Sequence, residues 1–190
     1  AAGLPTAVTL ACADAALAQS LHDRLASPNF RIYLSDDVVG AEVGGAVKNV
    51  LAIACGIAEG RRLGLNARAA LIARGFMEMT RFGLAFGARR ETLAGLAGLG
   101  DLVLTCSSTS SRNFSLGKGI GEGRAVDDLM ADRRTVAEGA FTAPVLACVA
   151  RERGIDMPIV FAIDDLIGGT VSVDAVVDQL LTRPPRPEGL

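Results

Sequence analysis

The sequence predicts a mainly α-helical protein preceded by a short strand–helix–strand unit, and three observations support this fold class. From about residue 36 onward, apolar residues recur at intervals of three and four, which is the spacing of one helix face. Before that point, two short β-rich runs flank one helical segment. Hydrophobic residues make up 50% of the 190 residues and charged residues 21%, which suits a packed core and excludes a largely disordered chain.

The N-terminal unit reads as one strand, one helix and a second strand. The first strand is expected over Thr6–Ala11 and the second over Phe30–Leu34. Between them, Asp14 is a candidate N-cap for a helix that runs to about Leu25. Two strands are too few for a stable sheet, because their unpaired edges need partners. We therefore expect this unit to be the end of a larger sheet.

The remainder is expected to be a succession of helices that form a bundle. A glycine turn at Gly98–Gly100, a polar stretch at Ser107–Asn113 and a glycine-rich helix or loop to Gly123 interrupt it. The tail over residues 183–190 holds three prolines and is expected to be disordered. The helices are expected over residues 36–60, 66–87 with Asn66 as N-cap, 91–97, 142–153, 158–167 and 172–182.

Composition argues against several classes of protein. The 19 basic and 21 acidic residues form no basic block, so no nucleic-acid partner is expected. No run approaches 18 uninterrupted apolar residues, and the N-terminus lacks the pattern of a signal peptide. We therefore expect no integral membrane segment and a cytoplasmic location.

The cysteines and the single histidine bear on metal binding and redox state. Cys12, Cys55, Cys106 and Cys148 lie far apart and form no CxxC pair, which favours buried free thiols in a reducing compartment. Because His22 is the only histidine, neither an HExxH motif nor a cysteine–histidine cluster is available, and no metal site is expected.

Two glycine-rich stretches differ from the dinucleotide-binding fingerprint GxGxxG. Gly117–Gly123 alternates glycines without the GxGxxG spacing, and Gly98–Gly100 has Val103 where the third glycine belongs. Neither follows a predicted strand. Glycines that permit tight turns and close packing are the preferred interpretation.

Polar residues inside apolar helix are more informative. Lys48 and Asn49 interrupt GGAVKNVLAIACG, and a lysine there either extends to the surface, which is the usual case, or faces a cleft. Asp101 follows a glycine turn, where it is either an ordinary N-cap or a functional carboxylate. Thr105 lies four residues later, on the same helical face as Asp101.

The run Ser110–Asn113 gathers hydroxyls, one guanidinium and one amide in a single polar loop. These donors suit a phosphate, because arginine presents a planar fork to its oxygens while hydroxyls and amides complete the shell. A solvated serine loop would have the same composition.

Four motifs resemble one known family along essentially the whole chain. They are GAEVGGAVKNVLAIACGIAEG, RAALIARGFMEMTRFG, GLGDLVLTC followed by SSRNFSLGKG, and TVAEGAFTA. They resemble the C-terminal, substrate-binding domain of bacterial NAD(P)-dependent glycerol-3-phosphate dehydrogenases. The resemblance implies a helical domain like the C-terminal domain of 6-phosphogluconate dehydrogenase over residues 38–182. It also implies that residues 1–37 are the last strands of a Rossmann nucleotide-binding domain.

The resemblance also implies an activity and partners. Such enzymes interconvert dihydroxyacetone phosphate and sn-glycerol 3-phosphate with NAD or NADP and supply glycerol 3-phosphate for phospholipid synthesis. Most of the nucleotide-binding domain is absent from this sequence, so the chain alone is expected to be inactive. An apolar helical surface makes a homodimer a reasonable expectation.

Carried over residue by residue, the resemblance makes Lys48 the catalytic general acid and base, with Asp101 orienting its ammonium group. Substrate contacts would come from Asn49, Thr105, Ser111, Arg112 and Asn113. Cofactor contacts would come from Arg112, Val136 and Glu138.

Two rival hypotheses stay open at this stage. One is another two-domain dehydrogenase, such as a ketopantoate reductase or a hydroxy-acid dehydrogenase, although the SRN loop argues against it. The other is a non-catalytic helical dimerisation module in which Lys48 and Asp101 are structural. Convergence of Lys48, Asp101, Thr105 and Arg112 on one cleft would favour the enzyme.

Overall fold

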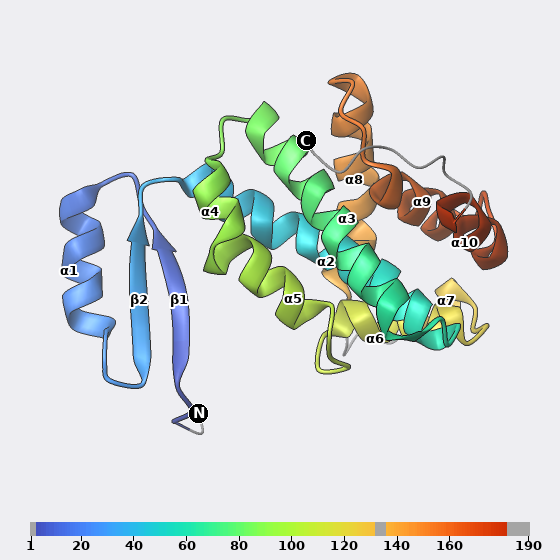
Figure 1. Cartoon of the computed structure of the whole chain (residues 1–190), viewed down its shortest axis with the longest axis horizontal. Coiled ribbons are helices and arrows are strands. Elements are labelled where there is room, and N and C mark those ends of the chain that lie inside the picture. Colours follow the sequence, from blue (N-terminus) through green and yellow to red (C-terminus); the bar gives the residue numbers. More distant parts are fainter. Residues whose placement is uncertain (1–2, 132–135, 182–190) are drawn as a thin grey trace.

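A computed structural model of the chain describes residues 3–131 and 136–181. A small unit of two strands and one helix stands at one end, and the remaining helices pack into a separate body beside it (Figure 1). This confirms the predicted fold class. The proposed disordered tail, 183–190, lies outside the described residues.

The N-terminal unit forms as the sequence predicts. Strand β1 (Thr6–Ala11) pairs in parallel with β2 (Phe30–Ser35). Helix α1 (Ala15–Leu25) connects them, and the Asp14 carboxylate accepts the first free backbone N–H groups of this helix at 2.9 and 3.0 Å. Within the described residues each strand pairs only with the other, so their outer edges are unpartnered there.

The helical body contains nine α-helices and one π-helical turn among the described residues. They are α2 (Val38–Gly60), α3 (Gly64–Ala85), α4 (Arg90–Ala94), the π-turn η1 (Leu96–Gly100), α5 (Asp101–Thr105), α6 (Arg112–Gly121), α7 (Val126–Met130), α8 (Glu138–Glu152), α9 (Pro158–Ile167) and α10 (Val173–Leu181).

Helix α2 is the centre of this body. It packs against α3, α5, α6 and α8, and its middle, from Val50 to Ala58, is completely enclosed. By length and composition α2 could cross a membrane, but here it is the buried core helix around which the others are arranged. Its apolar character therefore reflects burial within the protein.

Helices α2 and α6 touch through their backbones. A β-carbon added at Gly117 would overlap the carbonyl oxygen of Ile53, and one added at Gly121 would lie 2.5 Å from that of Ile57. Only residues without a side chain permit so close an approach. The interpretation of these glycines as packing residues is confirmed.

Three sequence-based boundaries were wrong. Helix α3 begins at Gly64, before Asn66, and α8 begins at Glu138, four residues before the expected start at Thr142. The expected turn at Gly98–Gly100 is the π-turn η1, which runs directly into α5. Helix α7 was not predicted.

One contact between distant segments and one local contact explain two of these differences. The backbone N–H of Gly139 donates to the side chain of Asn113, so the start of α8 is set by a partner far away in the sequence. At the π-turn, Gly98 lies directly against the carbonyl of Leu93, a position that admits no side chain.

The cysteines follow the prediction only in part. Cys55 and Cys106 are buried free thiols, and a hydrogen bond with Cys55, together with burial, raises the pKa of Cys106. Cys12 is half-buried, and Cys148 is exposed on the outer face of α8. The prediction of burial was wrong for Cys148, because an apolar stretch of helix also presents residues outward.

Glu78 is a charged group inside the helical body. Only 1% of the residue is exposed, and its carboxylate accepts the backbone N–H groups of Ile159 at 2.8 Å and Val160 at 3.2 Å. It therefore caps α9 from α3. Burial raises the pKa of Glu78 to about 7, and the two N–H groups oppose this rise only in part.

Glu78 should make stability fall with rising pH. The folded state keeps the proton up to about pH 7, whereas the unfolded chain releases it near pH 4.5. Its contribution is therefore complete below pH 4.5 and is lost by pH 7, amounting to about 3 kcal/mol. Urea unfolding of Glu78→Gln should show a much flatter dependence over this range. The exposed Glu42→Gln is the control, and an unchanged slope in Glu78→Gln would contradict this assignment.

Replacing a glycine by alanine usually stabilises a helix, but at the α2–α6 contact the same replacement should destabilise the fold. Gly117→Ala is expected to destabilise the fold by about 1–3 kcal/mol because its β-carbon overlaps Ile53. Gly45→Ala, a helical position with nothing within 4 Å of the added carbon, should stabilise it by up to about 1 kcal/mol. Equal unfolding midpoints for the two variants would show that the helices are free to separate.

Candidate active site

Three helices bring the predicted site residues into one region. The middle of α2 carries Lys48 and Asn49, α5 begins at Asp101, and α6 begins at Arg112. Helix α2 contacts both α5 and α6, so residues more than 50 positions apart in the sequence become neighbours.

Lys48 and Asp101 form the centre of the first contact group. The Lys48 ammonium donates a hydrogen bond to Asp101 Oδ2. Their side chains are 21% and 34% exposed, so the pair is partly shielded but reachable from solvent. The lysine therefore does not simply extend along the surface: it meets a carboxylate from another helix.

Thr105 supports this pair from the next turn of α5. Its hydroxyl donates to the backbone oxygen of Asp101 at 2.6 Å and lies 3.4 Å from Asp101 Oδ1. Gly44 of α2 packs directly on the carbonyl of Ala97 in η1, which brings the start of α5 close to Lys48. Gly44, one helical turn before Lys48, thus helps to place Asp101 beside the lysine.

A second contact group begins at Asn49. Asn113 donates from Nδ2 to Asn49 Oδ1 at 3.0 Å and accepts the N–H of Gly139 at 2.8 Å. Asn49 in turn donates to the backbone oxygen of Gly45 at 3.2 Å. The predicted substrate contacts Asn49 and Asn113 are therefore already engaged with the protein.

The other residues of the SRN element have separate positions. Ser111 is the N-cap of α6, and its hydroxyl accepts the N–H of Phe114 at 3.3 Å. Arg112 is 55% exposed and pairs with Glu138 at 3.3 Å. Glu138 and Val136 are also exposed, at 61% for the Glu138 side chain and 45% for Val136. All three predicted cofactor contacts therefore reach solvent.

The predicted residues thus form two groups joined through the adjacent positions Lys48 and Asn49. No described hydrogen bond or ion pair links Arg112 to the Lys48–Asp101 pair. Sequence reasoning did not single out Gly139, although it follows Glu138 within the quoted TVAEG motif.

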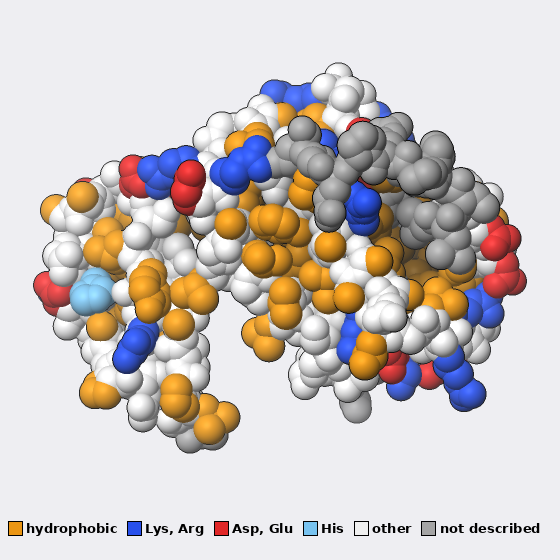
Figure 2. Space-filling view, viewed as in Figure 1, with side chains coloured by type: hydrophobic (Ala, Val, Ile, Leu, Met, Phe, Trp, Pro, Cys, Tyr) orange, Lys and Arg blue, Asp and Glu red, His pale blue; other side chains and the backbone are white. Residues whose placement is uncertain are grey.

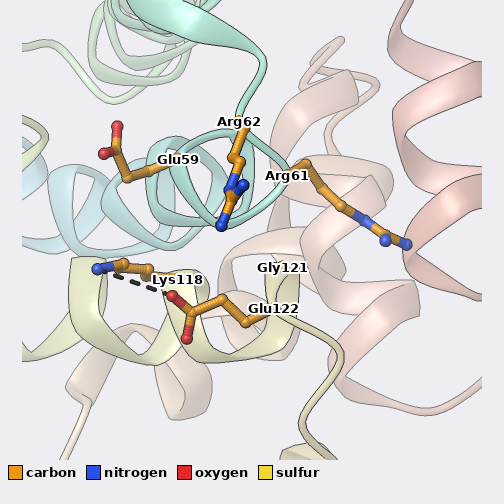
Figure 3. Close-up of a pocket in the computed structure, with 7 residues that line it drawn as sticks. Glu59, Arg61, Arg62, Lys118, Gly121 and Glu122 are labelled. Atoms are coloured by element: carbon orange, nitrogen blue, oxygen red, sulfur yellow. Dashed lines mark ion pairs between the residues drawn. The ribbon is translucent and has the colours of Figure 1, made fainter.

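The described cavity lies away from these residues. It has a volume of about 500 Å³ and is lined by Glu59–Arg62, Lys118, Gly121 and Glu122, at the other ends of α2 and α6 (Figure 3). Its charges are mostly paired, Lys118 with Glu122 at 3.7 Å and Glu59 with Arg68 at 3.2 Å. It contains none of the predicted site residues.

The surface beside α5 is apolar. Figure 2 shows a hollow between the N-terminal unit and the helical body, with hydrophobic side chains on the helical side. Among the exposed apolar residues of α5 are Val103 and Leu104, the latter 70% exposed. The helix that carries Asp101 therefore has an uncovered apolar face.

The arrangement contains a pair whose chemistry suits proton transfer and, separately, an exposed guanidinium whose chemistry suits an anion. A lysine ammonium held by a carboxylate can donate a proton to a developing alkoxide or, when neutral, remove one from a hydroxyl. The exposed guanidinium of Arg112 offers a planar fork to phosphate oxygens.

Comparisons with known proteins show to which family the chain belongs. The family described as the C-terminus of NAD-dependent glycerol-3-phosphate dehydrogenase matches residues 37–178. A glycerol-3-phosphate dehydrogenase (NAD(P)+) of Sphingopyxis alaskensis is 67% identical over 189 residues, which cover 100% of this chain and 57% of that protein. One from Erythrobacter litoralis is 68% identical over 188 residues, with 99% and 57% covered.

A solved structure gives the same result. The crystal structure of glycerol-3-phosphate dehydrogenase from Coxiella burnetii superimposes with a TM-score of 0.92 at 43% identity, over 96% of this chain and 56% of that one. The chain thus spans little more than half the length of the relatives it matches. It belongs to the family of glycerol-3-phosphate dehydrogenase C-terminal domains.

Proposed function

We propose that the chain is the substrate-binding half of an NAD(P)-dependent glycerol-3-phosphate dehydrogenase that interconverts dihydroxyacetone phosphate and sn-glycerol 3-phosphate. The observation that carries this proposal is the partly buried pair of Lys48 and Asp101. Asn49, the neighbour of Lys48 in the sequence, is hydrogen-bonded to Asn113, which follows Arg112 on α6. Lysine–aspartate pairs also occur on non-catalytic proteins, so it is the family match that favours the enzyme over a non-catalytic dimerisation module.

Lys48 handles the proton at C2 of the substrate. In the reductive direction its ammonium stabilises the alkoxide that forms at C2 and then donates a proton to it. In the oxidative direction the neutral amine removes the proton from the hydroxyl. Asp101 holds the ammonium in place, and Thr105 fixes Asp101 in turn.

Arg112 is the residue of the site that would bind a phosphate. Its guanidinium can bind two phosphate oxygens at once, and the Ser111 hydroxyl, which accepts the N–H of Phe114, keeps its own proton to donate. A keto acid offers this fork a carboxylate, which a guanidinium also binds through two hydrogen bonds. We prefer a phosphorylated substrate to that of a ketopantoate reductase or a hydroxy-acid dehydrogenase because relatives that are 67% and 68% identical are glycerol-3-phosphate dehydrogenases.

The exposed residues beside the pair fit a nucleotide. Val136 offers an apolar contact, and Arg112 and Glu138 offer polar ones. NAD or NADP, when bound, supplies the hydride that is added at C2 or accepts the hydride that is removed. The main nucleotide-binding surface would belong to the half of the protein that completes the β1–β2 sheet.

The remaining features of the proposal follow from the family. Residues 1–37 would belong to the nucleotide-binding domain and residues 38–182 to the substrate domain. The enzyme would act in the cytoplasm and supply glycerol 3-phosphate for phospholipid synthesis. The uncovered apolar surfaces are compatible with a homodimer.

Lys48 should be essential for turnover. In the chain joined to the nucleotide-binding half of the Sphingopyxis alaskensis relative, Lys48→Ala should lower kcat by roughly 10² to 10⁴, the usual contribution of a general acid. Oxidation of NADH or NADPH with dihydroxyacetone phosphate measures this, and the isolated chain, expected to be inactive, is the blank. A kcat within about twofold of the parent would rule out the catalytic assignment.

Arg112 should act on the phosphate alone. Arg112→Ala is expected to weaken transition-state binding by about 1.5–3 kcal/mol, or roughly 10- to 150-fold in kcat/KM. Arg112→Lys should recover only part of this, since a point charge does not reproduce the fork. Unphosphorylated dihydroxyacetone, measured in parallel, should be affected much less. Equal proportional losses for both substrates would place Arg112 on the cofactor or the fold instead.

A further inference from the structure

Three residues of the proposed site are each followed by a member of one hydrogen-bonded chain. Asn49 follows Lys48 on α2, and Asn113 follows Arg112 on α6. Gly139 follows Glu138 on α8. The three members come from three helices, and none of the hydrogen bonds that join them is local in the sequence.

The hydrogen-bonded chain of Asn49, Asn113 and Gly139 is largely buried, and its hydrogen bonds leave little room for movement. Asn113 is only 7% exposed, with Nδ2 3.0 Å from Asn49 Oδ1 and Oδ1 2.8 Å from the Gly139 nitrogen. A buried amide with partners on both ends has few alternative arrangements, because any rotation leaves a polar group unpaired. The starts of α6 and α8 are therefore fixed against the middle of α2.

Gly139 is the member without a side chain, and the structure shows why. A β-carbon at this position would lie 2.5 Å from the backbone oxygen of Asn49 and 2.9 Å from Asn113 Oδ1. Any other residue would push the first turn of α8 away from α2. Glu138, the neighbour of Gly139, would move with it and away from Arg112.

We propose that Gly139 is a positioning residue of the site, acting through Asn113 and Asn49 to set where Arg112 and Glu138 stand relative to Lys48. In this proposal Asn113 contributes mainly by holding three helices together, beyond any contact it makes with substrate. The effect on catalysis rests on the proposed function, whereas the effect on α8 does not.

The kinetic test is a double-mutant cycle in the fusion with the nucleotide-binding half of the Sphingopyxis alaskensis relative. Gly139→Ala and Asn113→Ala should each lower kcat/KM by roughly 10- to 100-fold, since a displacement near 1 Å is sufficient for such losses. The double variant should be little worse than the worse single variant, because both changes break the same chain. Ile163→Val, a conservative change in the buried core of α9, controls for loss of stability and should leave kcat/KM within about twofold.

A second measurement uses the 190-residue polypeptide without the fused nucleotide-binding half, and it needs no enzymatic activity. Hydrogen exchange of the Gly139 amide and the following turn of α8 should speed up about 3- to 10-fold in Asn113→Ala, because one buried hydrogen bond is lost. Asn113→Asp keeps an acceptor for the Gly139 N–H, so it should restore slow exchange there. Ile163→Val should not change exchange at this turn relative to the rest of α8.

The two proposals fail in different ways. If the unsubstituted fusion does not turn over dihydroxyacetone phosphate, the proposed function fails. The hydrogen-exchange measurement still decides whether the Asn49–Asn113–Gly139 hydrogen bonds hold the start of α8. Positioning by Gly139 is overturned if Gly139→Ala keeps full kcat/KM, if the two substitutions multiply in the double variant, or if Asn113→Ala leaves exchange of α8 unchanged.

Discussion

The direct backbone contact between α2 and α6 is the constraint on which the rest of the helical body depends. The two helices run parallel and in register, with Asn49 beside Asn113, Ile53 against Gly117 and Ile57 against Gly121. Each step is four residues, so one face of α6 follows one face of α2 for its whole length. At one end of this contact the polar pair lies beside Lys48.

In three places a buried polar side chain accepts backbone N–H groups at the start of a helix. Glu78 accepts the first N–H groups of α9, and Asn113 accepts that of Gly139 at the start of α8. Asp37 accepts the N–H of Gly40 in α2 and also that of Arg89, the N-cap of α4. The starts of α4, α8 and α9, which would be costly to bury unpaired, are thus satisfied by side chains from elsewhere in the fold, whereas Asp37 also caps its own helix α2. The helix starts and the core are therefore stabilised together.

Whether a helix start is capped by a local or a distant residue also decides whether the sequence could predict that start. Asp14 caps its own helix, so the start of α1 was predictable from local residues. The start of α8 depends on Asn113, 26 residues earlier, and no local signal marks it. The π-turn before Asp101 depends instead on a local contact, that of Gly98 with the carbonyl of Leu93 five residues earlier. The glycines predicted a turn there but not its π-helical geometry. For the site, the motifs indicated the residue types, but the linking role of Gly139 became visible only in three dimensions.

The two sides of the candidate site are built in different ways. Lys48, Asp101 and Asn113 are held by contacts within the helical body, so their mutual positions do not require any part of the N-terminal unit. Arg112, Val136 and Glu138 are exposed, and Arg112 and Glu138 pair with each other. In the proposed function Lys48 and Asp101 transfer a proton, a role that gains from fixed geometry at the moment of reaction. The exposed set would bind a ligand, a role that allows more freedom before the ligand arrives.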